Sequence, residues 1–81
     1  MPRISSKLDD VGALAQIGAA IRERRIEISL SQEALADLAK IDRSHMGRIE
    51  RGERNVTVMN LLRIADALGT RLSVLFNRAD L

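Results

Sequence analysis

Hydrophobic residues recur along the chain at intervals of three and four positions, the spacing of side chains on one face of an α-helix. Four helices follow from this spacing before residue 69, and a short fifth helix follows over residues 72–77. The apolar positions of the first two helices are Leu14, Ile17, Ile21 and Ile28, and then Ala34, Leu35, Leu38 and Ala39. Those of the last three are Met46 and Ile49, then Leu61, Leu62, Ile64, Ala65 and Leu68, and finally Leu72, Val74, Leu75 and Phe76. No stretch alternates as a strand does, so the sequence predicts an all-α fold of five helices.

Capping and stop signals mark the boundaries of these helices. Ser31, Asp42 and Thr57 each precede an apolar stretch, and their side chains can accept hydrogen bonds from the first free N–H groups of a helix. Gly52 and Gly69 follow such stretches, and glycine tolerates the left-handed conformation that closes many helices. The second and third helices are therefore separated only by residues 40–42.

The chain of 81 residues suffices for one domain, which we place at residues 10–81 behind a flexible N-terminal arm of residues 1–9. Gly12 and Gly18 lower the helix propensity of the first helix. Hydrophobic residues make up 46% of the chain, which is too many for a disordered protein.

Cysteine is absent, and the sequence shows no metal-ligand cluster, cofactor motif or nucleophile–base pair. We therefore expect that the protein is not an enzyme and that it binds neither a cofactor nor a metal. No apolar run approaches the roughly 20 residues that span a bilayer, so we expect a cytoplasmic protein.

The positive charge of the chain is small in sum but concentrated in place. The net charge is +2, yet eleven of the 13 cationic residues are arginine. Four of these lie close together: Arg43, Arg48, Arg51 and Arg54. Arginine presents a planar fork of donors that suits phosphates and guanine edges, although a solvated helix face is the simpler interpretation of such residues. The arrangement of the helices has to decide between the two.

A corner as tight as residues 40–42 makes two helices cross at a steep angle, which requires a small side chain at the crossing. Ala36 is placed to supply it. The third helix can then present outward four residues from its N-terminal end: Arg43, Ser44, Gly47 and Arg48. An α-helix fits the major groove of B-form DNA, where side chains of its first turns reach base edges. The residues alone therefore favour a helix-turn-helix that binds DNA.

Three motifs stand at fixed distances along the chain: Ser31-Gln-Glu-Ala-Leu-Ala, Ile49-Glu-Arg-Gly and Leu61-Leu-Arg-Ile-Ala-Asp-Ala-Leu-Gly69. Together they resemble the Cro/repressor (XRE-like) helix-turn-helix family, and the match runs from about Ile17 to Phe76. Residues 42–55 are similar to the controller proteins of restriction–modification systems, which are small dimeric regulators that bind inverted repeats. The resemblance implies a lambda-repressor-like domain with its helix-turn-helix at residues 32–51.

The resemblance also implies roles for single residues. The base-reading positions of the family match Arg43, Ser44, His45, Gly47 and Arg48. The phosphate-binding positions match Gln32, Arg51, Arg54 and Asn55. Glu50 matches a structural acid that pairs with an arginine of the first helix, here Arg25. In two places the chain departs from the family pattern: Lys40 stands in the turn where glycine is common, and Arg71 stands where a serine or threonine cap is usual.

The last helix, residues 72–77, is more apolar than a short terminal helix requires. Core packing accounts for part of its apolar stripe, and we expect the rest to form a dimer interface with a neighbouring part of the fourth helix. The residues predicted for this interface are Leu61, Leu72, Val74, Leu75 and Phe76. Twofold symmetry would place two recognition helices about 34 Å apart, in successive major grooves of a palindromic operator.

The sequence thus predicts a homodimeric regulator of transcription that binds specific sites on double-stranded DNA, with no membrane and no small-molecule ligand among its partners. Such a protein, of bacterial or phage origin, would act at the nucleoid in the bacterial cytoplasm. An antitoxin, or a phage-type repressor without a second domain, fits the same residues. A protein-interaction adaptor is the alternative from a different class, and the outward arginines argue against it.

Overall fold

A computed structural model describes residues 12–81, and within that range it contains five helices and no strand. This confirms the all-α architecture predicted from the hydrophobic spacing. The predicted arm of residues 1–9 lies outside the described residues. None of the helices in the described part is long and apolar enough to cross a membrane.

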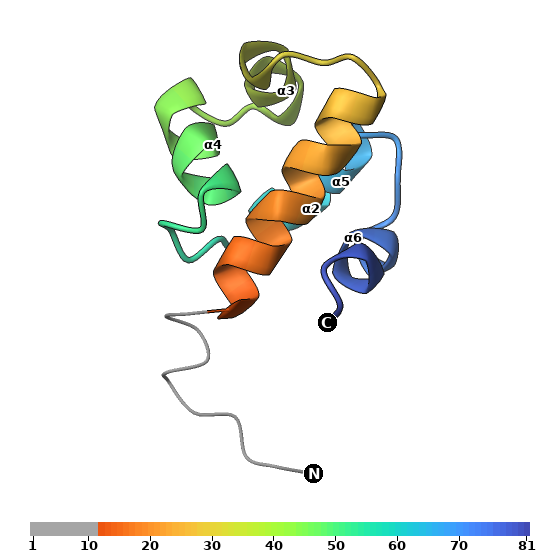
Figure 1. Cartoon of the computed structure of the whole chain (residues 1–81). Helices are drawn as coiled ribbons and strands as arrows, with labels where there is room; N and C mark the ends of the chain where they lie inside the picture. Colours follow the sequence, from red (N-terminus) through yellow and green to blue (C-terminus); the bar gives the residue numbers. More distant parts are fainter. Residues whose placement is uncertain (1–11) are drawn as a thin grey trace, which may run out of the picture.

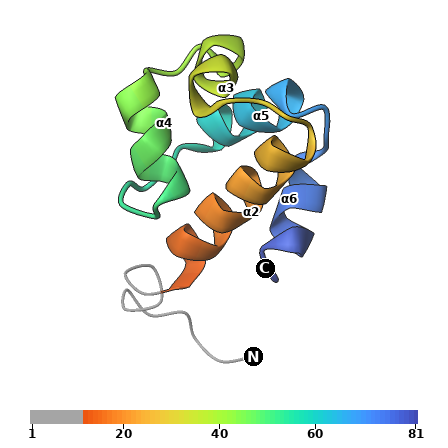
Figure 2. The ribbon, with the colours of Figure 1, turned by 45° about the horizontal axis from the view of Figure 1, so that its top comes forward.

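Helix α2 (Leu14–Glu27) crosses the middle of the molecule. The corner formed by α3 (Gln32–Ala39) and α4 (Arg43–Glu50) lies on one side of it, and α6 (Leu72–Arg78) lies on the other (Figure 1). Helix α5 (Val58–Ala67) passes behind α2 and packs against both α3 and α6 (Figure 2). One core joins all five helices, and its largest fully buried side chains are Ile21, Leu35, Met46, Ile49, Ile64, Leu68 and Leu75.

The helix boundaries follow the predicted capping residues. The side-chain oxygens of Ser31 and Thr57 accept hydrogen bonds from the backbone N–H groups three residues later, at 3.0 and 3.1 Å. Gly52 and Gly69 close α4 and α5 with φ angles of 74° and 66°. Lys40 takes the same left-handed conformation at the end of α3, with φ 58°, although it carries a side chain. This conformation costs a non-glycine residue about 1 kcal/mol.

Two predicted core residues instead face solvent. Leu38 is 59% exposed and Leu62 is 45% exposed. The buried stripe of α3 passes through Leu35, Ala36 and Ala39, which leaves Leu38 at the outer edge of the helix. In α5 the buried residues follow the three- and four-residue spacing from Leu61, and Leu62 lies about 100° further round. Hydrophobicity alone did not show which of two neighbouring leucines faces inward.

Helices α2 and α4 approach closely at Gly18, where α2 crosses the C-terminal end of α4. A Cβ atom on Gly18 would lie 2.3 Å from the carbonyl oxygen of Glu50 and 2.5 Å from that of Ile49. Ala15 lies one turn before Gly18 in α2, and a Cβ atom on Gly52 would lie 2.7 Å from the Cα atom of Ala15. The sequence marked Gly18 only as a weak helix former, whereas the structure shows that its missing side chain allows α4 to pack directly on α2. Ala36 is buried, as its predicted place at the corner requires.

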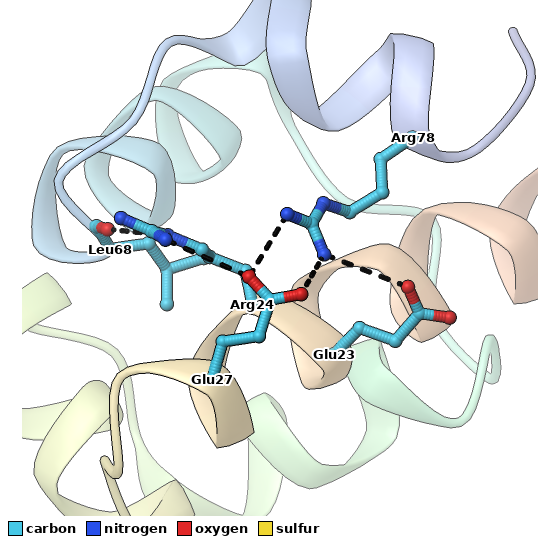
Figure 3. Close-up of polar contacts among 5 residues, drawn as sticks. All are labelled: Glu23, Arg24, Glu27, Leu68 and Arg78. Carbon is cyan, nitrogen blue, oxygen red and sulfur yellow. Dashed lines mark hydrogen bonds and ion pairs between the residues drawn. The ribbon is translucent and has the colours of Figure 1, made fainter.

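Arg78 ties the C-terminal helix to α2 by ion pairs. Its guanidinium donates to both carboxylate oxygens of Glu27, at 2.5 and 3.0 Å, and lies 3.7 Å from a carboxylate oxygen of Glu23 (Figure 3). Beside it, Arg24 Nε donates to the carbonyl oxygen of Leu68 at 3.1 Å, so α2 also holds the end of α5. The N-cap residue of α6, Arg71, makes no side-chain cap hydrogen bond. The ion pairs of Arg78 therefore hold α6 on α2 from its other end.

We predict that Gly18→Ala destabilises the fold by about 1–3 kcal/mol, because the atoms that the new methyl group meets are backbone and cannot swing aside. For a domain of this size each kcal/mol lowers the melting temperature by about 4–8 °C. Thermal unfolding followed by circular dichroism measures the change. Gly12→Ala is the matched control, because among residues 12–81 the nearest atom outside the local backbone that its added Cβ would meet is a glutamine side-chain oxygen at 3.7 Å. Equal melting temperatures for the two variants would contradict the packing argument.

A second prediction concerns the acid stability of the α2–α6 contact. The hydrogen bond from Arg78 lowers the pKa of Glu27 below its ordinary value of 4.5. A carboxyl whose pKa is lowered by folding stabilises the protein above its unfolded pKa, and that stability is lost as the pH falls through the folded pKa. The melting temperature of Glu27→Gln should therefore lie below that of the parent protein at pH 7, and the gap should close as the pH falls below 4.5 and through the lowered pKa of Glu27. In the control variant Glu33→Gln the gap should be small throughout. A gap for Glu27→Gln that stays constant with pH would refute the ion-pair account.

Candidate nucleic-acid interface

Helix α4 forms an outer edge of the molecule and turns one face to solvent (Figures 1 and 2). Asp42 caps it, and one carboxylate oxygen accepts hydrogen bonds from the backbone N–H groups of Ser44 and His45 at 3.1 and 3.4 Å. Met46 and Ile49 point into the core, as predicted. The buried pair thereby fixes which residues face outward, and these are Arg43, Ser44 and Arg48.

An open depression of about 480 Å³ lies between the starts of α3 and α4. Its lining comprises Gln32, Asp42, Arg43, Ser44, Gly47, Arg48 and Arg51. Three of these residues are arginines, and Gln32 and Ser44 add neutral polar groups. Within residues 12–81 no ion pair involves Arg43, Arg48 or Arg54. The depression therefore offers unneutralised guanidinium groups to an anionic ligand.

The buried carboxylate of Glu50 connects α4 to α2 and α3 beside the depression. Its side chain is 3% exposed, and its two oxygens accept from Arg25 Nε at 2.7 Å and from an Arg25 terminal nitrogen at 3.0 Å. A third bond comes from Gln32 Nε2 at 3.1 Å, and Arg25 also donates to the carbonyl oxygen of Leu30 at 3.0 Å. The structure thus brings together Arg25 and Glu50, the ion pair implied by the resemblance, and adds Gln32 to it. One N–H of the Gln32 amide donates to Glu50, and within residues 12–81 the other N–H makes no hydrogen bond to a protein group.

Arg51 already has an anionic partner on the surface. Its Nε and a terminal nitrogen donate to the two carboxylate oxygens of Glu53 at 2.9 and 3.3 Å. These bonds lower the pKa of Glu53 and raise the pKa of Arg51. Arg54 and Asn55 are exposed in the loop that follows α4. The motifs did not indicate a role for Glu53, although an acid two residues from a predicted phosphate ligand is the signal that would have revealed it.

Three predicted site residues need correction. Gly47 is buried, and a Cβ atom there would lie 3.1 Å from an Arg51 guanidinium nitrogen and 3.2 Å from the Gln32 side-chain oxygen. It provides room for those side chains and has no side chain with which to read a base. Leu61 and Leu75 are buried in the core of the single chain and have almost no surface left for a second copy.

Other predicted residues keep an exposed surface. Val74 is 45% exposed on α6, and Leu72 and Phe76 are half-buried on either side of it, where they also pack against the core. The apolar surface that α6 offers to a partner is therefore smaller than the sequence predicted. His45 is also half-buried, at the edge of the outward face of α4.

Comparison with known proteins agrees with this geometry. The model of the helix-turn-helix family matches residues 21–75. The chain belongs to that family. Control protein C.SmaI of Serratia marcescens is 41% identical over 61 residues, which cover 75% of this chain and 73% of the relative. Control protein C.MunI of a Mycoplasma species is 43% identical over 54 residues, covering 67% and 73%.

Solved structures give the same result. The restriction–modification controller protein C.AhdI from Aeromonas hydrophila superposes with a TM-score of 0.77 at 46% identity, over 78% of this chain and 96% of that chain. The controller protein C.Esp1396I, solved as a tetramer in complex with its natural 35 base-pair operator, superposes with a TM-score of 0.77 at 31% identity, over 84% and 90%. The resemblance to controller proteins seen in the motifs is thereby confirmed.

We predict that Glu50→Ala destabilises the protein far more than Glu53→Ala. Loss of Glu50 leaves the charge of Arg25, whose side chain is only 13% exposed, without a partner, which costs about 3–5 kcal/mol. Loss of Glu53 removes a solvent-exposed pair and should leave stability nearly unchanged. Urea unfolding of both variants and the parent measures the difference. Equal unfolding midpoints for the two variants would show that the buried pair adds nothing to stability.

Proposed function

We propose that this protein is a transcriptional regulator that binds a specific double-stranded DNA site as a homodimer, and that it serves as a controller protein of a restriction–modification system. The observation that carries the proposal is the outward face of α4, which presents Arg43 and Arg48 beside the depression bounded by Gln32 and Arg51. The similarity to controller proteins across most of the chain supports the finer role. We expect no catalytic activity. Its place of action would be the nucleoid in the bacterial cytoplasm.

The proposed division of labour follows from the position of each side chain. Arg43, Ser44 and Arg48 face outward from α4 and are assigned to base edges in the major groove, with His45 at the margin. Gln32 is assigned to a backbone phosphate, because Glu50 orients its amide at the N-terminal end of α3. The C-terminal end of α4 and the following loop hold Arg51, Arg54 and Asn55. These residues are assigned to backbone phosphates on the other side of the major groove from the phosphate assigned to Gln32.

Dimerisation is assigned to α6. Val74 and the exposed parts of Leu72 and Phe76 form its apolar surface, and the ion pairs of Arg78 hold the helix at a fixed angle on α2. A rigid mount matters because the separation of two recognition helices has to match one helical turn of DNA, about 34 Å. The operator complex of C.Esp1396I supports an oligomeric protein on DNA as the working form.

The test is selection of binding sites from a random pool of duplex DNA, with the parent protein, two variants of the proposed interface and one control variant. The parent should enrich an inverted repeat with half-sites about one helical turn apart. Arg48→Ala should relax the preference at one position of each half-site, since a bidentate contact to a base discriminates by about 1–3 kcal/mol. Arg54→Ala should weaken binding to every sequence and reduce the slope of log K against log salt by about 1.

Arg63→Ala is the matched control. Arg63 is an exposed arginine of α5 whose guanidinium donates to the side chain of Asn60, outside the proposed interface. Uniform weakening by both Arg48→Ala and Arg54→Ala would contradict the division of labour. Enrichment of sites without symmetry would contradict the dimer. No binding to any duplex at low salt would overturn the proposed function and favour a protein-interaction adaptor.

A further inference from the structure

The hydroxyl group of Ser44 is not free at the tip of α4. Its Oγ lies 2.5 Å from a carboxylate oxygen of Asp42, and the same oxygen accepts the backbone N–H of Ser44 at 3.1 Å. Both side chains are exposed, and both line the depression beside Arg43 and Arg48. Asp42 therefore binds Ser44 twice, once through the backbone and once through the side chain.

The chemistry of the two groups fixes the direction of the side-chain bond. An ionised carboxylate has no proton to give, so the Ser44 hydroxyl must be the donor. The hydrogen bond from that hydroxyl and the one from the His45 backbone lower the pKa of Asp42, and the carboxylate stays ionised at neutral pH. A hydroxyl has one proton and two lone pairs. Once the proton points at Asp42, only the lone pairs remain for a further partner.

We propose that Asp42 sets Ser44 as a hydrogen-bond acceptor, so that Ser44 reads an amino group in the major groove: N6 of adenine or N4 of cytosine. This rests on the proposed function, which places the outward face of α4 in that groove. The alternative partners of a serine, O6 and N7 of guanine and O4 of thymine, are themselves acceptors and find no donor here. Asp42 is then a positioning residue, because it acts through Ser44.

The neighbours of Ser44 show how this acceptor would change the base specificity of α4. Arg43 and Arg48 carry only donors, which match the acceptors of guanine. A recognition face made of donors alone would favour guanine at every position that it reaches. An acceptor that lines the same depression as two arginines lets this part of the helix require an adenine or a cytosine at one position of the site.

The experiment measures binding to the selected operator by fluorescence anisotropy, after removal of single functional groups from the DNA. Selection with Ser44→Ala first identifies the position whose preference depends on Ser44. At that position adenine is replaced by purine, or cytosine by 2-pyrimidinone, either of which deletes the amino group. The parent protein should lose about three- to tenfold in affinity, the worth of one hydrogen bond. Ser44→Ala should show that loss on the unmodified operator and no further loss on the modified one.

Deletion of an acceptor in the same base pair is the control on the DNA side. Replacing the purine N7 by carbon should change the affinities of parent and Ser44→Ala by the same factor. A larger effect of this change on the parent would show that Ser44 donates to the base, which overturns the proposal. An unchanged site preference for Ser44→Ala would overturn it as well.

Asp42→Gly tests the positioning role. The same Asp42 oxygen caps α4 and accepts the Ser44 hydroxyl, and glycine removes it at only a small cost to the stability of the helix start, which leaves the serine proton free for a base. We expect the amino-group requirement to shrink to less than about twofold, with a melting temperature close to that of the parent. Asp37→Asn, at an exposed position of α3, removes the same charge and should keep the requirement. Equal loss of the requirement in both variants would assign the effect to charge and overturn the role of the hydrogen bond.

The outcomes also separate this proposal from the proposed function. If the parent enriches no site, both are wrong. If it enriches an inverted repeat in which no position depends on Ser44, the proposed function stands and the assignment of Ser44 fails.

Discussion

The buried carboxylate of Glu50 is the interaction on which the arrangement of the outer surface depends. It lies at the last residue of α4 and is held by Arg25 from α2 and Gln32 from α3, so three helices meet at one group. A buried charge is tolerated only when its hydrogen bonds are satisfied, and here each oxygen of the carboxylate accepts at least one. The same group that fixes the helix pair also orients Gln32, the first residue of α3, which lines the depression beside α4.

Two glycines make this arrangement possible. Because Gly18 and Gly52 carry no side chain, α2 and the end of α4 meet backbone to backbone, and the carboxylate of Glu50 comes within reach of Arg25. The apolar residues of α4 contribute only Met46 and Ile49 to the core. A helix with so narrow an apolar face leaves most of its circumference for other purposes, which is why its arginines can face solvent without loss of stability.

The sequence predicted the fold in most respects, because caps and helix-closing glycines are local signals. Ser31, Asp42 and Thr57 act where their side chains reach a nearby backbone N–H, and no distant residue alters that. Long-range contacts were not predictable in the same way. The approach at Gly18, the burial of Leu75 and the pairing of Arg78 with Glu27 each depend on how helices distant in sequence are docked. The Arg25–Glu50 pair was accessible only through the family resemblance.

The pairing of Arg51 with Glu53 has a consequence for how tightly the surface holds any polyanion. The two residues form a neutral unit, so the arginine does not add a full positive charge to the face of α4. A phosphate that approaches Arg51 also meets the carboxylate of Glu53, so repulsion from this carboxylate offsets part of the attraction to the arginine. The offset weakens unselective attraction to every phosphate chain alike and leaves contacts to base edges untouched. A regulator has to dissociate from unselective DNA in order to find its own site. The carboxylate of Glu53 beside Arg51 shortens the time that the protein spends on such DNA.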